Sequence, residues 1–118
     1  MNRRERGAAL VWSIVLIQVL MVVTMAGLAV SSVAMAHSRA ASVADLAALA
    51  AAQSSDDACA AALLAAEANG ARLADCRSQA EDVEVAVSLP VSGVPSGLLM
   101  LLGIPDGFLI ERARAGPQ

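Results

Sequence analysis

The chain has 118 residues and a formal net charge of −3, and 58% of its residues are hydrophobic although only 2% are aromatic. After residue 36 it contains five arginines against ten acidic residues. This balance argues against a surface that binds nucleic acid or anionic lipid, because such a surface needs a basic patch. Trp12 and Phe108 are the only aromatic residues, which also argues against platforms that stack bases or sugars.

An uncharged run from Gly7 to Ala36 follows three arginines within residues 3–6. A helix needs about 20 mostly apolar residues to cross the hydrocarbon core of a bilayer, and this run is longer. The first charges beyond it, Arg39 and Asp45, nearly cancel. The positive-inside rule therefore predicts a single-pass protein of the cytoplasmic membrane, with its N-terminus inside and everything after Ala36 outside.

The helix is expected to continue beyond the membrane, because residues 39–53 contain no Gly or Pro and are rich in alanine, the best helix former. Apolar residues recur there at helical spacing and predict one weakly apolar stripe, formed by Val43, Leu46, Ala47 and Ala50. The expected organisation is a basic cytoplasmic leader (1–7), a transmembrane and extended helix (8–53) and a small exported domain (54–118).

The exported domain is expected to begin with a second helix. Ser54 to Asp57 interrupt the long helix and offer N-cap residues for a helix over about 57–69. Asn69 and Gly70 are a typical stop signal.

Two cysteines, Cys59 and Cys76, lie on the exported side, in the first turn of that helix and in the segment that leads to the first strand. An even number of cysteines in an oxidising compartment favours a disulfide. Closing this loop would stabilise the domain by about 3 kcal/mol in the chain-entropy model. The alternative is a pair of buried free thiols.

From Asp82 the hydrophobic period changes to that of a strand. Apolar residues alternate with polar or small ones over residues 83–89, which predicts a half-buried strand that Pro90 ends or places at an edge. Residues 108–115 can also be extended. We therefore expect an α+β fold, in which a long transmembrane helix extends outward and is followed by a small disulfide-tied helix and a two-stranded antiparallel, hairpin-like sheet.

Between the two predicted strands lies the apolar run Leu98–Leu102. It is too short to span a bilayer. Three placements are open: it could pack into the small core, touch the membrane surface, or fill a partner's groove.

The apolar helix could also be a secretory signal, since Ala34-Met35-Ala36 matches a signal-peptidase site. However, the run is about twice as long as an ordinary signal sequence, so retention as an anchor is favoured over release.

Polar and small residues inside the apolar helix predict contacts with other helices. An amide in hydrocarbon seeks a partner, and pairs of small residues four apart permit close helix approach. The residues in question are Gln18, Gly27, Ser31, Ser32 and Ala36. The alternative is that the hydroxyl groups hydrogen-bond to their own helix and contact no partner.

The sequence shows no group of residues typical of a catalytic site. His37 has no second metal ligand close to it in the sequence, and the adjacent Asp56 and Asp57 are explained by helix capping. No phosphate-binding loop, nucleophile elbow or Cys–His pattern is present. We therefore expect no enzyme, no metal and no cofactor.

A basic leader ending in Gly7, a long apolar helix and the Ala-rich stretch Arg39 to Ala52 resemble the TadE/TadG-like proteins of tight-adherence (Flp) pilus systems. The cysteine-containing segments, the strand DVEVAV and the terminal ARAG close to Pro117 resemble one actinobacterial branch, the helicase/secretion-neighbourhood TadE-like proteins.

The resemblance implies a minor pilin or pseudopilin. Related pilins are cut after the leader glycine and carry a Glu at the fifth mature position. Gly7 and Ala8 fit such a cleavage, but the fifth residue is Trp12, which cannot neutralise a neighbouring subunit's N-terminal amine.

The predicted function is therefore a non-catalytic, membrane-anchored minor-pilin-like component of a Tad-type pilus or secretion apparatus, acting through helix packing and partner binding. Its expected partners are the lipid bilayer, other pilin-like or secretion-apparatus membrane proteins and a second copy of itself, with no nucleic acid. The alternatives are a soluble binding module released after Ala36 and a membrane-bound assembly factor that never enters a filament.

Overall fold

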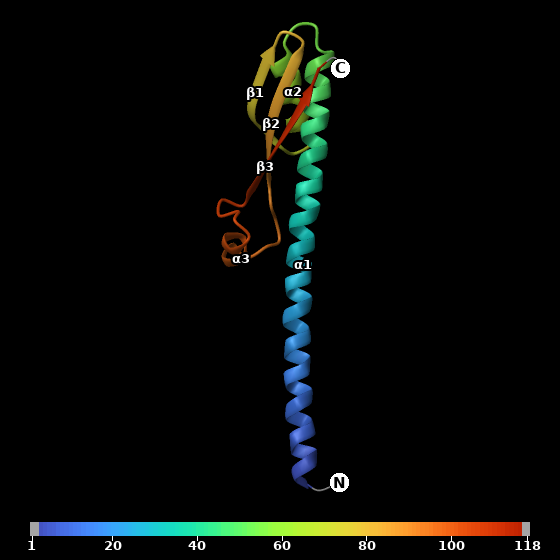
Figure 1. The fold of residues 1–118 in the computed structure, drawn as a ribbon, viewed down its shortest axis with the longest axis vertical. Helices are drawn as coiled ribbons and strands as arrows, with labels where there is room; N and C mark the ends of the chain where they lie inside the picture. Colours follow the sequence, from blue (N-terminus) through green and yellow to red (C-terminus); the bar gives the residue numbers. More distant parts are fainter. Residues whose placement is uncertain (1–2, 117–118) are drawn as a thin grey trace. The chain divides into compact units, whose positions relative to one another are not determined.

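The computed structural model describes residues 3–116, with side chains from Glu5 onward. Met1 and Asn2 of the predicted leader, and Pro117 and Gln118 at the other end, lie outside the described residues. Packing divides the chain into two units, residues up to Ser31 and residues from Ser32 onward. In chain order the described elements are α1 (Arg3–Gln53), α2 (Ala58–Ala68), β1 (Arg72–Gln79), β2 (Asp82–Pro90), α3 (Ser96–Leu101) and β3 (Phe108–Ala115) (Figure 1).

Helix α1 is continuous over 51 residues, and it ends at Gln53 as the sequence predicts. It begins earlier than expected, at Arg3, so the described part of the basic leader is helical. In the part of α1 up to Ser31, the large apolar side chains are exposed along the whole length. Such a surface suits lipid or other apolar helices rather than water.

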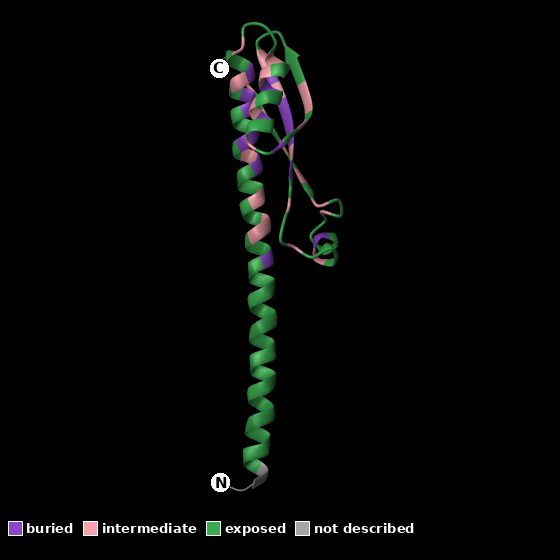
Figure 2. Cartoon of the chain, turned by 180° about the vertical axis from the view of Figure 1, so that it is seen from behind, coloured by how far each residue is buried: buried purple, intermediate pink, exposed green. Residues whose placement is uncertain are grey.

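The core of the second unit is built on a row of small residues in the C-terminal part of α1. Figure 2 shows buried positions recurring along one face there. Their helical spacing of three or four residues is that of a single face, and they are Ala40, Val43, Ala44, Ala47, Ala48 and Ala51. They form one cluster with Ala62 and Ala66 of α2 and the inward residues of β2.

The predicted stripe on this helix is right in part. Val43 and Ala47 are buried, but Leu46 is 49% exposed and Ala50 is only partly covered. The buried face of the helix consists mainly of alanines, because their small side chains let α2 and the sheet approach the helix closely. The larger leucine lies outside this face.

Helix α2 is confirmed, with both predicted ends. The Asp57 side chain accepts a hydrogen bond of 3.1 Å from the backbone N–H of Ala60, which is the expected N-cap interaction. At the other end Asn69 is the C-cap residue, and Gly70 adopts a φ of 74°, a left-handed conformation that glycine reaches without strain.

The α+β fold is confirmed, with one strand more than expected in the described residues. The sheet is antiparallel throughout, in the order β1-β2-β3, and β1 forms a hairpin with β2. The segment before the first predicted strand is thus itself a strand. A β-bulge between Leu73 and Asp75 shifts its register, so Leu73 and Cys76, three residues apart, both face inward opposite Val87 and Val85. This shift disrupts the alternation by which a strand is recognised.

Strands β2 and β3 are confirmed. Val83, Val85, Val87 and Leu89 of β2 are buried, as predicted for one face of a half-buried strand. Residues of β3 alternate between partly covered and exposed positions. Phe108 and Ile110 fall on the exposed side.

The predicted disulfide is present between Cys59 and Cys76, with the two Cα atoms 5.9 Å apart. It ties the first turn of α2 to β1. Both cysteines are partly covered, and Cys76 packs against the core cluster. The alternative of two free thiols is therefore wrong.

The apolar run Leu98–Leu102 lies mostly in the short helix α3. Leu99 is buried, whereas Met100 and Leu101 are 73% and 84% exposed. The core cluster of the domain contains none of these residues. Leu99 is therefore buried outside the core cluster, beside Gly107, and packing into the small core does not account for the run.

Candidate functional site: the helix surface, the exit cleft and the outer sheet face

Most hydroxyl groups of the apolar helix are bonded to their own backbone. Ser13 donates to the carbonyl of Ala9 at 2.8 Å and Ser31 to that of Gly27 at 2.9 Å, and Thr24 donates to the carbonyl of Leu20. These bonds satisfy the hydroxyl donors without a second helix. These hydroxyl groups therefore need no hydrogen-bond partner on another helix.

Gln18 differs from these hydroxyls. Its side chain is exposed and makes no hydrogen bond to any other residue that the structure describes. An exposed amide in the hydrocarbon region gains from a partner on another helix. Gln18 is therefore the strongest candidate on this surface for a contact with a neighbouring membrane protein.

The predicted packing residues do not form one surface. At about 100° per residue, Gln18 and Gly27 lie on opposite sides of α1. Gly27 and Ser31 share a face that is exposed in this chain. Ser32 and Ala36 instead line a cleft that the same chain forms, so they are already partly covered.

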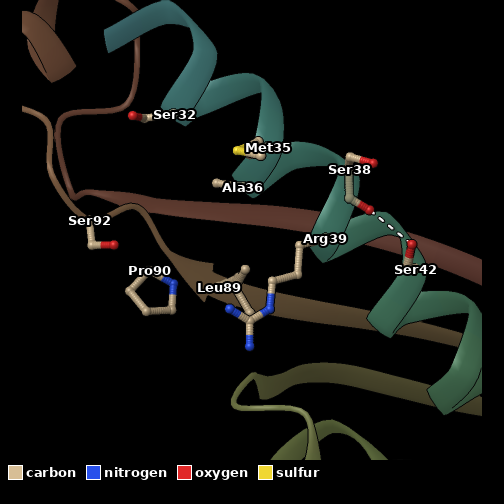
Figure 3. Close-up of a pocket in the computed structure, with 9 residues that line it drawn as sticks. All are labelled: Ser32, Met35, Ala36, Ser38, Arg39, Ser42, Leu89, Pro90 and Ser92. Atoms are coloured by element: carbon tan, nitrogen blue, oxygen red, sulfur yellow. Dashed lines mark hydrogen bonds between the residues drawn. The ribbon is translucent and has the colours of Figure 1, made fainter. Parts of the chain in front are cut away.

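We call this cleft the exit cleft, because it lies where the uncharged run of α1 ends. Its volume is about 660 Å³, and it is lined by Ser32, Met35, Ala36, Ser38, Arg39, Ser42, Leu89, Pro90 and Ser92. Figure 3 shows the Arg39 side chain reaching across it towards Leu89 and Pro90. The Ser42 hydroxyl is occupied by a 3.0 Å hydrogen bond to the carbonyl of Ser38.

Arg39 makes no ion pair with any residue in the described part of the chain. One guanidinium beside serine hydroxyls and an apolar wall can bind an anionic oxygen group. The cleft lacks a carboxylate or imidazole in its lining, so this arrangement offers charge and hydrogen bonds rather than proton transfer.

His37, for which the sequence indicates no metal site, contacts β3. Its Nδ1 atom lies 2.7 Å from Oε1 of Glu111. Glu111 has the same parity in β3 as Leu109 and Ala113, which are also partly covered. The alternation along β3 is therefore the sequence signal that Glu111 lies on the side of the strand that faces α1. Nothing in the sequence indicates which residue of the helix it contacts.

Ion pairs cover one half of the outer face of the sheet. Arg112 pairs with Glu84 at 3.5 Å, and Arg114 pairs with Asp82 on the same two strands. On β1, Arg77 pairs with Asp75 at 3.2 Å. The hydrogen bond from Arg114 to Asp82, and then the negative charge of that carboxylate, raise the pKa of the Arg114 guanidinium.

The other half of the outer face carries large apolar side chains on β3 and one arginine, Arg72 on β1, which lies opposite Ser88. Phe108 pairs with Pro90 and Ile110 with Ser88 in the register of β2 and β3. Both Phe108 and Ile110 are exposed. Strand β3 therefore passes from an apolar end, next to the loop that carries α3, to a charged end at Arg112 and Arg114.

The remaining predicted site residues lie on the exposed N-terminal part of α1. Gly7, Ala8 and Trp12 are helical and exposed. Processing after Gly7 stays a prediction. Among the described residues no group of three or more His, Cys, Asp or Glu side chains could hold a metal ion.

These features define a class of protein. In the described residues one helix, over Glu5–Gln53, is long and apolar enough to cross a membrane, and a small disulfide-tied α+β domain follows it. This architecture fits a single-pass membrane protein.

Comparison with known families gives a more particular result. Residues 7–54 match the family described as "Putative Flp pilus-assembly TadE/G-like". The resemblance to TadE/TadG-like proteins is thereby confirmed for this part of the chain, which coincides with α1. No curated protein and no solved structure matches the chain. The assignment to an actinobacterial branch stays a prediction.

Proposed function

We propose that this protein is a non-catalytic, minor-pilin- or pseudopilin-like component of a Tad-type pilus or secretion apparatus. The observation that carries the proposal is the coincidence of the family match, residues 7–54, with helix α1, Arg3–Gln53. The matched segment thus includes the part of α1 with an exposed apolar surface, and such a surface acts by packing against lipid or other helices.

In this proposal the N-terminus lies in the cytoplasm and the small domain lies outside the cytoplasmic membrane. The leader comprises residues 1–7, the transmembrane and extended helix residues 8–53 and the exported domain residues 54–118. The Cys59–Cys76 bond supports this orientation, because disulfides persist in oxidising compartments and are rare in the cytosol. The excess of arginine before the apolar run supports it independently.

The partners proposed for α1 are apolar helices of other pilin-like or secretion-apparatus proteins, or of a second copy of this chain. Gln18 supports this part of the proposal, since its amide makes no hydrogen bond in the described part of the chain. Gly27 and Ser31 offer a second, separate face where another helix could approach closely.

A second candidate function is a soluble binding module released by cleavage after Ala36. One observation favours it: the buried row on the C-terminal part of α1 begins at Ala40. Cleavage after Ala36 would therefore leave the core cluster and the disulfide of the domain intact.

The N-terminal sequence of the mature protein distinguishes these functions. We expect Met1 for an unprocessed anchor or Ala8 for a processed pilin, in either case in the membrane or filament fraction. A start at His37 in the soluble fraction would contradict the anchored function. Presence in sheared filaments would further separate a filament subunit from an assembly factor that stays in the membrane.

A further inference from the structure

We propose that helix α3 and the apolar end of β3 rest on the lipid surface of the membrane that α1 spans. The surface in question, here called the apolar end, consists of Met100, Leu101, Phe108 and Ile110. This inference rests on the proposed membrane-spanning role of α1. It adds a second contact with the bilayer, made by the exported domain itself.

The first supporting observation is exposure. Leu101 is 84% exposed and Met100 is 73% exposed. Phe108 and Ile110, on the outer side of β3, are exposed as well. Several large apolar side chains gathered at one end of a small domain are unfavourable in water and mark a contact surface.

The second observation is position. Pro90 and Ser92, which lead into the loop that carries α3, line the exit cleft together with Ser32 and Ala36. Ala36 is the last residue of the uncharged run. The loop therefore leaves the sheet at the level where the uncharged run of α1 ends, which the proposed function takes as the membrane boundary.

The third observation is charge. From Val85 to Pro105 the sequence contains no charged residue. The ion pairs of the sheet lie at the opposite end, where Glu84 pairs with Arg112. A surface that changes from apolar to charged with distance from the membrane boundary fits the interface of a bilayer, where the polar side remains in water.

These observations favour lipid over a second copy of the chain as the occupant. In the proposed function α1 enters lipid near Ala36, so the loop that carries α3 starts beside a bilayer that the anchor itself already requires. The four residues of the apolar end carry no charge, and the charged residues near them are one acid, Asp106, and one base, Arg72. We therefore expect neutral phosphatidylcholine to suffice. A contact that requires anionic lipid would need basic residues that this loop lacks.

The test uses the full chain in phosphatidylcholine bilayers that contain lipids brominated at defined depths, which quench nearby tryptophan fluorescence. The natural Trp12 reports whether α1 is inserted. In the Trp12→Phe background, Leu101→Trp places a single tryptophan on α3. The matched control is Leu64→Trp in the same background, because Leu64 is 69% exposed but lies on α2. The disulfide joins α2 to Cys76 of β1, which pairs with Val85 in the charged half of the sheet. Leu64 therefore lies on an element that is attached away from the apolar end.

We expect quenching of the Leu101→Trp protein by shallow bromines to be several-fold stronger than that of the Leu64→Trp protein, with emission shifted to the blue. Both replaced leucines are exposed, and retention of the disulfide and helical content verifies the fold of each variant. Equal, weak quenching of both variants beside strong quenching of Trp12 would overturn the lipid contact and leave the anchor intact. A blue shift that depends on protein density and not on bromine would assign the surface to a second copy instead. Absence of Trp12 quenching would overturn the membrane-anchored function, and this inference with it.

Discussion

His37 on α1 and Glu111 on β3 form a contact of 2.7 Å between Nδ1 and Oε1. It joins the helix, one turn before the buried Ala40, to a strand at the edge of the sheet. The His37 side chain is 62% exposed, so the interaction is expected to contribute modestly. Exposed pairs of this kind contribute about 0.2–1 kcal/mol.

A double-mutant cycle with His37→Ala and Glu111→Ala measures this coupling. We expect the two changes together to destabilise the domain less than the sum of the single changes, by an amount within that range. The measurement is chemical unfolding of the full chain in detergent micelles. The control pairs His37→Ala with Arg114→Ala, whose partner is Asp82, and we expect no coupling there. Zero coupling between His37 and Glu111 would contradict the contact.

The disulfide is expected to be a main source of stability, because the core consists largely of alanines. Cys59→Ser and Cys76→Ser should each lower the free energy of unfolding by about 2–5 kcal/mol. The double variant should be no less stable than either single variant, since the same bond is lost in all three. Unfolding with and without reductant checks this result. Free thiols in the native, non-reduced protein would contradict it.

The buried face of α1 predicts an unusual pair of mutational effects. Ala44→Leu should destabilise the domain by about 1–3 kcal/mol, because added methylene groups overpack the contact with α2 and the sheet. Leu46→Ala should change stability by less than about 0.5 kcal/mol, because this side chain is half exposed. Thermal unfolding of the two variants compares them directly. The opposite order would show that Leu46, which belongs to the apolar stripe predicted from the sequence, lies in the core.

Gln18→Leu tests the proposed helix contact in the membrane. We expect it to weaken association between neighbouring helices by about 0.6 kcal/mol, the average for a hydrogen bond between membrane helices. Energy transfer between labelled copies, or between this chain and a candidate partner, measures the association. Ser13→Ala is the matched control, since its hydroxyl already bonds to Ala9, and it should have no effect. Equal association of all three proteins would exclude Gln18 from the interface.

Trp12→Glu separates a filament subunit from a protein that stays in the bilayer. For a stationary anchor the new carboxylate costs up to about 3 kcal/mol on insertion, and less near the interface. We expect a lower yield in the membrane fraction and no gain in filaments. The amounts in membrane and sheared-filament fractions are the readout. Strong enrichment in filaments would instead show that the glutamate restores a subunit contact.

The elements with local signals were predictable from the sequence, and those set by tertiary contacts were not. Asp57 and Asn69 mark the ends of α2 because capping depends on a few adjacent residues. Strand β1 was missed because a bulge after Leu73 disrupts its alternation. Leu46 belongs to the apolar stripe that helical spacing predicts, but close packing in this domain selects alanine and leaves the leucine half exposed.

The features of the candidate site also differ in whether a local sequence pattern indicates them. The disulfide was predictable because the chain has only two cysteines. The contact between His37 and Glu111 depends on how β3 lies against α1, which no local pattern encodes. The exit cleft likewise requires residues of α1 and β2 that are far apart in the sequence.

The alanine face of α1 has a consequence for the way this gene can vary. A single base change in an alanine codon yields Val, Thr, Pro, Ser, Gly, Asp or Glu. At Ala44 and Ala47, which are fully buried, most of these replacements add volume, charge or a helix break, and only Ser and Gly keep the side chain small. At the exposed Leu46 and Leu49 added volume or charge is tolerated, and among single-base changes proline is the one that breaks the helix. In a library of single-nucleotide variants, folded protein should therefore be lost more often at the alanines than at the leucines, the reverse of what a hydropathy profile suggests.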